Sequence, residues 1–368
     1  MAAEPTLQFR DPDAADELVG RLETLMAEIA QPVSVMHVCG SHEQAIAKFG
    51  LRSMLPADLT IRMGPGCPVC VTNMPEVDEA VSLARDGAIV TTYGDMYRVP
   101  GTTESLGDAS ATGADVEIVY AASEAVELAE ANPNREVVFF ATGFETTAAP
   151  TAAVLRDDPP ANFSVLSAHK YVPPAMNVVA ELPETDIDGF LAAGHAAVIT
   201  GYSLFEPFVE EYETPVVVGG FEPLDILLGL ERLLEHINDD RAALENAYPR
   251  CVTEDGNTAA LEAMWDVFEP TTGEWRGIAD IPDANLVLRE EYAEYDARKR
   301  FDIDPDVGTA DPLTAECRCG DIMAGTADPD DCALFGEECG PQTPVGACMV
   351  SSEGPCKIWL EYGGKPDL

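Results

Sequence analysis

Short apolar runs alternate with helical patterns along most of the chain, and this alternation constrains the fold more than any other feature. Residues 12–30 place apolar side chains at helical spacing, and the run at residues 33–38 that follows is typical of a strand. Repeated strand, loop and helix units favour parallel sheets with helices on their faces. Further strands are predicted at residues 59–63, 88–92, 116–120, 137–141, 163–166, 197–200 and 215–219.

The predicted strands outnumber those of a typical single sheet. We therefore expect an α/β protein with two doubly wound α/β lobes, each built on a parallel sheet, around a cleft. Residues 1–120 form the first predicted lobe, and residues 121–300 form the second. Beyond about residue 301, Asp, Pro and Gly dominate and periodicity is lost, so residues 301–368 are predicted to be a cysteine-rich domain.

Acidic residues outnumber basic ones by 66 to 21, which gives a formal net charge of −45. Nucleic acid and anionic membranes are therefore unfavourable partners, because both would be repelled over most of the surface. The acidic residues are spread along the whole chain, which favours a halophilic protein adapted to high salt. The sequence has no apolar run near the roughly 20 residues of a membrane helix and no signal-peptide pattern, so we expect a cytoplasmic protein.

Nine of the ten cysteines fall in groups that indicate metal or redox chemistry. In a cytosolic chain of this size, such groups point to metal or thiol use rather than to a disulfide scaffold. Cys251 stands apart, within residues 248–252 that suggest a short edge strand, and is expected to be a packed thiol. The grouped cysteines are Cys39, Cys67, Cys70, Cys317, Cys319, Cys332, Cys339, Cys348 and Cys356.

The segment Gly-Pro-Gly-Cys-Pro-Val-Cys at residues 64–70 presents two thiols on a stiff loop. Thiols three positions apart can close on each other as a disulfide or bind one soft metal together. Gly64 and Gly66 permit backbone angles that other residues avoid, while the two prolines fix φ. We therefore expect Cys67 and Cys70 to be a reactive pair.

Cys39 lies where a predicted strand gives way to a helix. Open α/β sheets bind ligands at the carboxyl ends of their strands, and a helix N-terminus lowers the pKa of a nearby thiol. His42 follows three residues later, and a structural hydrogen bond and a functional role fit it about equally well. Glu145 ends another predicted strand, where a helix cap explains it nearly as well as a pocket does.

Six cysteines crowd the C-terminal segment, which lacks the apolar residues to fold alone. Metal ligation usually stabilises the fold of such a segment. Zinc and an iron–sulfur cluster both fit, but the spacings are looser than the paired Cys-x2-Cys knuckles of zinc ribbons, which favours a cluster. Spacing alone does not select four ligands among the six cysteines.

Four segments resemble the HypD family of [NiFe]-hydrogenase maturation factors. They read Val-Cys-Gly-Ser-His-Glu at residues 38–43, Gly-Pro-Gly-Cys-Pro-Val-Cys-Val-Thr at 64–72, Gly-Phe-Glu-Thr-Thr at 143–147 and Pro-Val-Gly-Ala-Cys-Met-Val-Ser-Ser-Glu-Gly-Pro-Cys at 344–356. The resemblance covers nearly the whole chain, with these segments and the cysteine-rich end in the expected order. The first motif departs from the family pattern Cys-Gly-x-His-x-His, because Gln44 replaces the second histidine and removes a titratable group.

The resemblance implies a scaffold on which the Fe(CN)2CO unit of the hydrogenase active site is built. In that family a small maturation chaperone, HypC, shares the iron, and the cyanide donor HypE docks on the pair. By motif position, Cys39 would be the iron thiolate, with Cys67 and Cys70 as a redox-active pair beside it. His42 and Glu353 would be accessory groups of the same site.

For the cysteine-rich end, the resemblance implies a [4Fe-4S] cluster and a second thiol pair. This pair, Cys319 and Cys348, would relay electrons toward the thiols of the first lobe. The arrangement would resemble ferredoxin:thioredoxin reductase, in which a cluster lies against a disulfide. The cluster ligands that the resemblance implies are Cys317, Cys332, Cys339 and Cys356.

Two functions of different classes fit the sequence. In the assembly scaffold, a soft thiolate holds iron that carries cyanide and carbon monoxide, and a dithiol supplies the two electrons that release cyanide from a thiocyanate. In a cluster-dependent thiol–disulfide oxidoreductase, Cys39 would have no part. A zinc-stabilised binding protein is a third alternative. Loss of bound iron in Cys39→Ala would distinguish the first function from the second.

Overall fold

Two parallel β-sheets form the framework of the computed structural model, which describes residues 9–182, 185–303 and 312–364. The first sheet has five parallel strands in the order β2-β1-β7-β8-β9. These strands are β1 (Val33–His37), β2 (Leu59–Met63), β7 (Gly189–Ala193), β8 (Val216–Gly219) and β9 (Leu244–Asn246).

The second sheet has four parallel strands in the order β4-β3-β5-β6. Every residue of β5 and β6 is buried, as in sheets that are covered on both faces. The prediction of an α/β protein with two parallel sheets is therefore confirmed. The strands of the second sheet are β3 (Ile89–Thr92), β4 (Val116–Ile118), β5 (Val137–Gly143) and β6 (Phe163–His169).

The two sheets do not follow the order of the chain. The first sheet uses residues 33–63 and 189–246, and the second is built from residues 89–169 between them. Residue 120, where we expected one lobe to end, lies between β4 and β5 of the same sheet. The chain therefore leaves the first lobe after β2 and returns to it at β7.

The strand predicted at residues 197–200 is wrong, because these residues belong to helix α9 (Gly194–Thr200). The strand of this region is β7, whose sequence Gly-Phe-Leu-Ala-Ala has no β-branched residue. β7 pairs with β1 on one side and β8 on the other. Pairing with two neighbouring strands and burial at the centre of the sheet outweigh the weak strand propensity of the β7 sequence.

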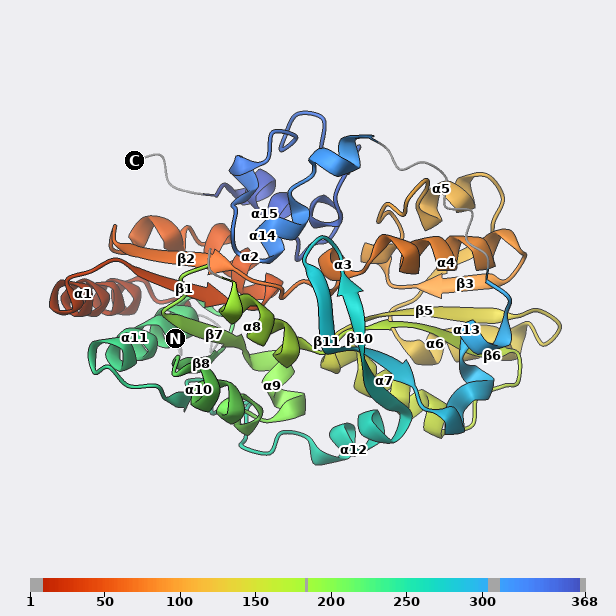
Figure 1. Ribbon diagram of the computed structural model, residues 1–368, viewed down its shortest axis with the longest axis horizontal. Coiled ribbons are helices and arrows are strands. Elements are labelled where there is room, and N and C mark those ends of the chain that lie inside the picture. The colour runs from red at the N-terminus through yellow and green to blue at the C-terminus, as the bar shows by residue number, and fades with distance from the viewer. Residues whose placement is uncertain (1–8, 183–184, 304–311, 365–368) are drawn as a thin grey trace, which may run out of the picture.

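Helices cover both faces of the first sheet. α1 (Pro12–Ile29) and α11 (Pro223–Asn238) pack against each other on one face (Figure 1). Side chains of β7 alternate between the faces: Leu191 joins the core under these helices, whereas Phe190 and Ala192 join the core on the other side. The other helices of the two lobes are α2 (Gly40–Lys48), α3 (Pro68–Val71), α4 (Met74–Arg85), α5 (Leu106–Ala111), α6 (Ala122–Ala131), α7 (Glu145–Arg156), α8 (Val172–Glu181), α10 (Glu206–Tyr212), α12 (Thr258–Val267) and α13 (Ala297–Arg300).

An antiparallel hairpin of β10 (Phe268–Trp275) and β11 (Ala279–Leu288) crosses the middle of the molecule (Figure 1). It adjoins the second sheet, where the backbone N–H of Tyr171 donates to the carbonyl oxygen of Ala284 at 2.8 Å. The tip of the hairpin points toward α3 and toward the C-terminal segment (Figure 1).

The cysteine-rich segment consists of short elements and turns above the first lobe (Figure 1). Its elements include α14 (Cys319–Met323), the 3-10 turn η8 (Ala347–Met349) and α15 (Pro355–Tyr362). α15 packs on α2, and both α14 and η8 pack on α3. The segment therefore lies directly over the elements that carry Cys39, Cys67 and Cys70. Across the described ranges, no helix is both long and apolar enough to cross a membrane.

Candidate functional site

Cys39 caps helix α2 at the carboxyl end of β1, as predicted. Its side chain is buried, and its Sγ lies 3.8 Å from Nδ1 of His195. Burial, followed by the nearby carboxylate of Glu353, raises the pKa of Cys39 to about 12, although N–H groups at the start of α2 oppose the shift. Burial thus outweighs the helix effect that we expected from the sequence, and the thiol is protonated at neutral pH.

His195 is the imidazole nearest to Cys39, and sequence analysis gave no reason to select it. It lies in the first turn of α9, directly after β7, and β7 is the neighbour of β1 in the sheet. Because the sequence pattern placed the strand later in the chain, His195 was not expected at a strand end. Recognising β7 would have identified it.

His42 is buried beside Cys39 but its ring is already engaged. Its Nε2–H donates to the carbonyl oxygen of Gly220 at 2.9 Å, and its ring stacks on Phe221 with 4.8 Å between centroids. Burial and the neighbouring imidazoles lower the pKa of His42 to about 3, so it is neutral. The hydrogen bond to Gly220 fits a structural role for His42. The Nδ1 atom of His42 has no partner among the described residues.

Glu353 reaches the same site from the C-terminal segment. Ser41 Oγ donates to its Oε1 at 2.7 Å, and burial raises the pKa of the Glu353 carboxyl. Gly40 permits this approach, because a Cβ there would lie 2.4 Å from Cβ of Glu353. The structure therefore brings together Cys39 and Glu353, which are more than 300 positions apart in the sequence.

Buried Glu43 fixes α15 on α2. Its carboxylate accepts hydrogen bonds from His37 Nε2 at 2.8 Å, Trp359 Nε1 at 2.6 Å and both terminal nitrogens of Arg52. Burial raises the pKa of Glu43, but the Arg52 charge and these bonds outweigh it and hold the pKa below its ordinary value. The position of Glu353 next to Cys39 is thus supported by a charged, hydrogen-bonded anchor.

Cys67 and Cys70 form a disulfide at the start of α3, and both are fully buried. The loop that carries them crosses the backbone of Cys39. Gly66 makes this crossing possible, because a Cβ there would lie 2.1 Å from the carbonyl carbon of Val38 and 2.2 Å from N of Cys39. The carbonyl oxygen of Gly66 also accepts a hydrogen bond from the N–H of Gly40 at 3.1 Å.

Four free thiols cluster in the C-terminal segment. Burial and the neighbouring sulfurs of the other three raise the pKa of Cys356 well above its ordinary value. Backbone N–H groups face two of the sulfurs: that of Val345 lies 3.4 Å from Cys339, and that of Cys319 faces Cys317. The four thiols are those of Cys317, Cys332, Cys339 and Cys356.

This donor set fits a metal–thiolate centre. Such centres are held by four cysteine thiolates whose sulfurs accept hydrogen bonds from backbone amides. Gly346 leaves room at the sulfurs, since a Cβ there would lie 2.7 Å from Sγ of Cys317. A bound cation would also remove the repulsion that makes four adjacent thiolates unfavourable.

The second thiol pair forms a disulfide between Cys319 and Cys348, beside the four free thiols. Gly354 packs on the carbonyl oxygen of Cys348, so the pair adjoins the turn that carries Glu353. Both disulfides are buried in the same hydrophobic core. The second disulfide therefore adjoins both the thiol cluster and the turn that carries Glu353.

A small cavity lies next to His195, the imidazole that contacts Cys39. About 20 Å³ of it is open to the centre of a water molecule, enough for roughly one water. Gly66, Glu145 and His195 are among its lining residues. Oε1 of Glu145 accepts the N–H of Val172 at 2.9 Å, Oε2 has no partner among the described residues, and burial raises the pKa of Glu145 to about 7.

Cys251 takes no part in the site. It is exposed and lies in a turn, so the predicted edge strand and packed thiol are both wrong. The ring of its neighbour Tyr248 packs against the guanidinium of Arg250, whose carbon lies 4.3 Å from the ring centroid. The exposed position makes Cys251 a useful control for the other thiols.

Comparison with known proteins agrees with the arrangement of these motifs. The HypD family, described as "Hydrogenase formation hypA family", matches residues 13–363. The hydrogenase maturation factor HypD2 of Bradyrhizobium diazoefficiens is 43% identical, over 97% of this chain and 96% of its own length. The hydrogenase maturation factors HypD of Azotobacter vinelandii and Cupriavidus necator are 41% and 40% identical, over 97% and 98% of this chain and 96% and 97% of their own lengths.

Full-length similarity at this level and the clustering of the motif residues lead to one conclusion. The chain belongs to the HypD family of hydrogenase maturation factors.

Proposed function

We propose that the protein is the scaffold on which the Fe(CN)2CO unit of [NiFe] hydrogenase is assembled, with Cys39 as the iron thiolate. One observation carries this proposal: the loop of the Cys67–Cys70 disulfide crosses the backbone of Cys39 so closely that a Cβ on Gly66 would lie 2.2 Å from N of Cys39. A soft thiolate that suits iron with cyanide and carbon monoxide ligands thus lies beside a two-electron thiol couple.

The dithiol form of Cys67 and Cys70 would release cyanide from a thiocyanate on the donor protein. In this step the S–CN bond breaks, the two thiols give up two electrons and two protons, and a disulfide forms. The products are a donor thiol and hydrogen cyanide, so atoms and electrons balance. Iron is the cargo in this reaction, and the Cys39 thiol would lose its proton on binding it. His42 and Glu353 would be accessory groups of the iron site.

We further propose that Cys317, Cys332, Cys339 and Cys356 hold a [4Fe-4S] cluster. When bound, a cluster of this kind supplies electrons one at a time. The Cys319–Cys348 pair would accept them and pass them toward Cys67 and Cys70. The pair suits this role because its helix α14 packs on α3 and its sulfurs are buried in the same core.

The partners in this proposal are a small HypC-like chaperone that shares the iron and a HypE-like cyanide donor. Assembly would take place in the cytoplasm. We also propose that the net charge of −45 suits a halophilic protein that works at high salt. None of these roles calls for nucleic acid or a membrane.

Infrared spectroscopy tests the scaffold directly. Protein purified without oxygen together with its small partner is expected to show metal-bound cyanide and carbonyl stretches. Cys39→Ala should lose these bands and keep its cluster iron and sulfide, while Cys251→Ala should keep both. Bands that persist in Cys39→Ala, or that are absent from fully loaded wild-type protein produced with the cyanide donor, would refute the scaffold.

A second function, a cluster-dependent thiol–disulfide oxidoreductase, is favoured by the two buried disulfides next to four clustered thiols. In that function Cys39→Ala would reduce a substrate disulfide at a near-normal rate. The same variant therefore separates the two functions.

A further inference from the structure

Arg276 is a buried cation without a carboxylate partner. Its side chain is 6% exposed, and no ion pair joins it to an acidic group in the described parts of the chain. Its Nη2 donates to the carbonyl oxygen of Pro100 at 2.8 Å, whereas Nη1 has no partner among the described residues. A buried charge without a counterion is costly, and acidic residues are abundant here, so the unpaired guanidinium requires an explanation.

The charge of Cys317, when it is a thiolate, and the charge of Asp78 act on the guanidinium of Arg276. Both carboxylate oxygens of Asp78 already accept hydrogen bonds from Thr102, one from its N–H and one from its hydroxyl. Cys317 is a free thiol of the four-thiol cluster, and burial raises the pKa of this thiol while the guanidinium charge opposes the shift. The unpaired charge therefore lies near the proposed cluster site, since the adjacent Gly277 packs on Gly320 of the helix that begins at Cys319.

Arg276 sits at the tip of the hairpin, between the two helices that begin at the disulfides. Its backbone N–H donates to the carbonyl oxygen of Val71, the residue after Cys70, at 3.0 Å. The next residue, Gly277, packs on Gly320, where a Cβ would lie 2.0 Å from the carbonyl oxygen of Gly277. The tip thus touches α3 on one side and α14 on the other.

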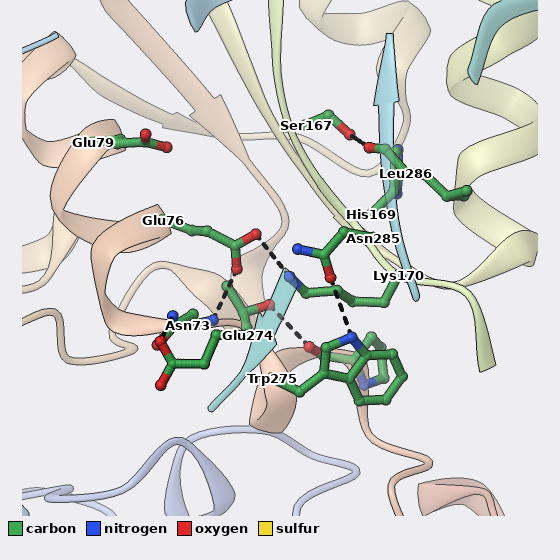
Figure 2. Close-up of polar contacts among 12 residues, drawn as sticks. Asn73, Glu76, Glu79, Ser167, His169, Lys170, Glu274, Trp275, Asn285 and Leu286 are labelled. Carbon is green, nitrogen blue, oxygen red and sulfur yellow. Dashed lines mark hydrogen bonds and ion pairs between the residues drawn. The ribbon is translucent and has the colours of Figure 1, made fainter. Parts of the chain in front are cut away.

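The framework around the tip holds the backbone at Arg276 in place, and the hydrogen bond to Pro100 orients the guanidinium. In Figure 2, Glu274 accepts a hydrogen bond from Asn73 Nδ2 at 2.8 Å, and Trp275 Nε1 donates to Asn285 Oδ1 at 3.2 Å. The Trp275 ring also stacks on Phe144, with 5.9 Å between centroids. A charge fixed in this way needs no reorganisation to act on a neighbouring metal centre.

We propose that Arg276 is the charge-compensating residue of the metal centre held by the four thiols, and that it raises the reduction potential of that centre. The inference rests on the proposed cluster. A cluster with four thiolate ligands is anionic and gains a further negative charge when it is reduced. A buried, fixed cation beside one ligand stabilises the reduced form more than the oxidised form. Arg276 therefore favours reduction of the cluster, which would lie next to the Cys319–Cys348 disulfide.

The test is the midpoint potential of the cluster in full-length protein, followed by electron paramagnetic resonance during anaerobic titration with dithionite. Arg276→Gln is expected to lower the equilibrium constant for reduction at least tenfold, which is about 59 mV for a one-electron couple. Arg276→Lys keeps the charge and should keep most of the potential. The matched control is Arg318→Gln, since Arg318 adjoins Cys317 in the sequence but its side chain is 40% exposed, so solvent screens its charge.

The iron and sulfide contents of each variant show whether it has bound a cluster, and they distinguish the remaining outcomes. If Arg276→Gln fails to load a cluster while Arg276→Lys loads one, the charge is required and the inference stands. Equal loss of the cluster in both variants, or an unchanged potential in loaded Arg276→Gln, would show that Arg276 is only a structural contact to Pro100. Wild-type protein that binds no iron and sulfide after reconstitution would overturn both the proposed cluster and this inference. The infrared test of Cys39 does not depend on that result, so a failure of the scaffold proposal can be recognised separately.

Discussion

Glu145 is a buried carboxyl group at the start of α7, and it lines the same small cavity as His195. Burial raises its pKa to about 7, so the folded protein holds a proton there that the unfolded chain releases near its ordinary pKa of 4.5. Between these two values the folded state binds more protons than the unfolded state. Stability must therefore fall as the pH rises toward 7 and then level off.

We expect Glu145→Gln to remove this pH dependence. The wild-type free energy of unfolding should fall by up to ~3 kcal/mol relative to the variant as the pH rises from 5 to 7.5. Denaturant unfolding at constant salt measures the difference. Glu127→Gln, an exposed carboxylate on α6, should follow the wild type. Parallel pH profiles of wild-type and Glu145→Gln protein would contradict the prediction.

Gly66 is the residue that allows the disulfide loop to cross Cys39. In Gly66→Ala the new Cβ would collide with the Val38–Cys39 peptide, and we expect a loss of ~2 kcal/mol of stability, as in overpacked cores. The displaced loop should also expose the Cys39 thiol to alkylation, which mass spectrometry can follow.

Gly20→Ala is the matched control for this substitution. Gly20 lies within α1, and a Cβ there meets nothing within 4 Å. This change should stabilise the protein by about 0.5–1 kcal/mol and leave the labelling of Cys39 unchanged. A Gly66→Ala protein with wild-type stability and labelling would show that the loop does not depend on this close approach.

At the level of elements, a buried ion pair joins α4 to the end of β6. Figure 2 shows Lys170, which is fully buried, donating from Nζ to Oε1 of Glu76 at 2.7 Å. Glu76 also accepts the N–H of Asn73 and so closes the cap of α4. Because α4 follows α3 directly, the pair fixes the helix that begins at Cys67.

We expect Lys170→Met and Glu76→Gln each to destabilise the protein by about 3 kcal/mol, because each leaves a buried group without its charged partner. The double variant should lose clearly less than the sum of the two single changes. Denaturant unfolding of all four proteins gives this coupling. Lys299→Met, which breaks an exposed pair with Glu290, should have little effect. Additive losses in the double variant would mean that the pair contributes nothing as a pair.

The helices and strands differ in how well the sequence predicted them. Strands with β-branched or aromatic residues, such as β5 and β8, and the loop at residues 64–70 were predictable from local patterns. β7 was not, because its Gly and Ala residues form a strand only through pairing with β1 and β8. His195 was missed for the same reason.

Arg276 was missed for a different reason. It lies in a hairpin turn and becomes significant only where the tip meets α3 and α14. Contacts between elements that are distant in the chain leave no local pattern in the sequence. The motifs therefore predicted which thiols form the candidate sites, but not the groups that surround them.

For the whole molecule, the net charge of −45 predicts a strong dependence of stability on salt. Charges of one sign repel each other most in the compact state, and salt screens this repulsion within about 10 Å at 0.1 M and about 3 Å at 1 M. We expect the melting temperature to rise steadily between 0.1 and about 1 M potassium chloride. Calorimetry at constant pH measures it, and a melting temperature that is flat or falls with salt would contradict the prediction.

The interleaved order of the two sheets has a consequence for protein synthesis. β1 and β2 leave the ribosome early, but β7, the other neighbour of β1, follows only after the whole second sheet has been made. At usual elongation rates this interval is on the order of ten seconds. Throughout it, the nascent chain carries Cys39, Cys67 and Cys70 on an unfinished lobe. These thiols are therefore exposed to oxidants and stray metal ions for longer than any others in the protein.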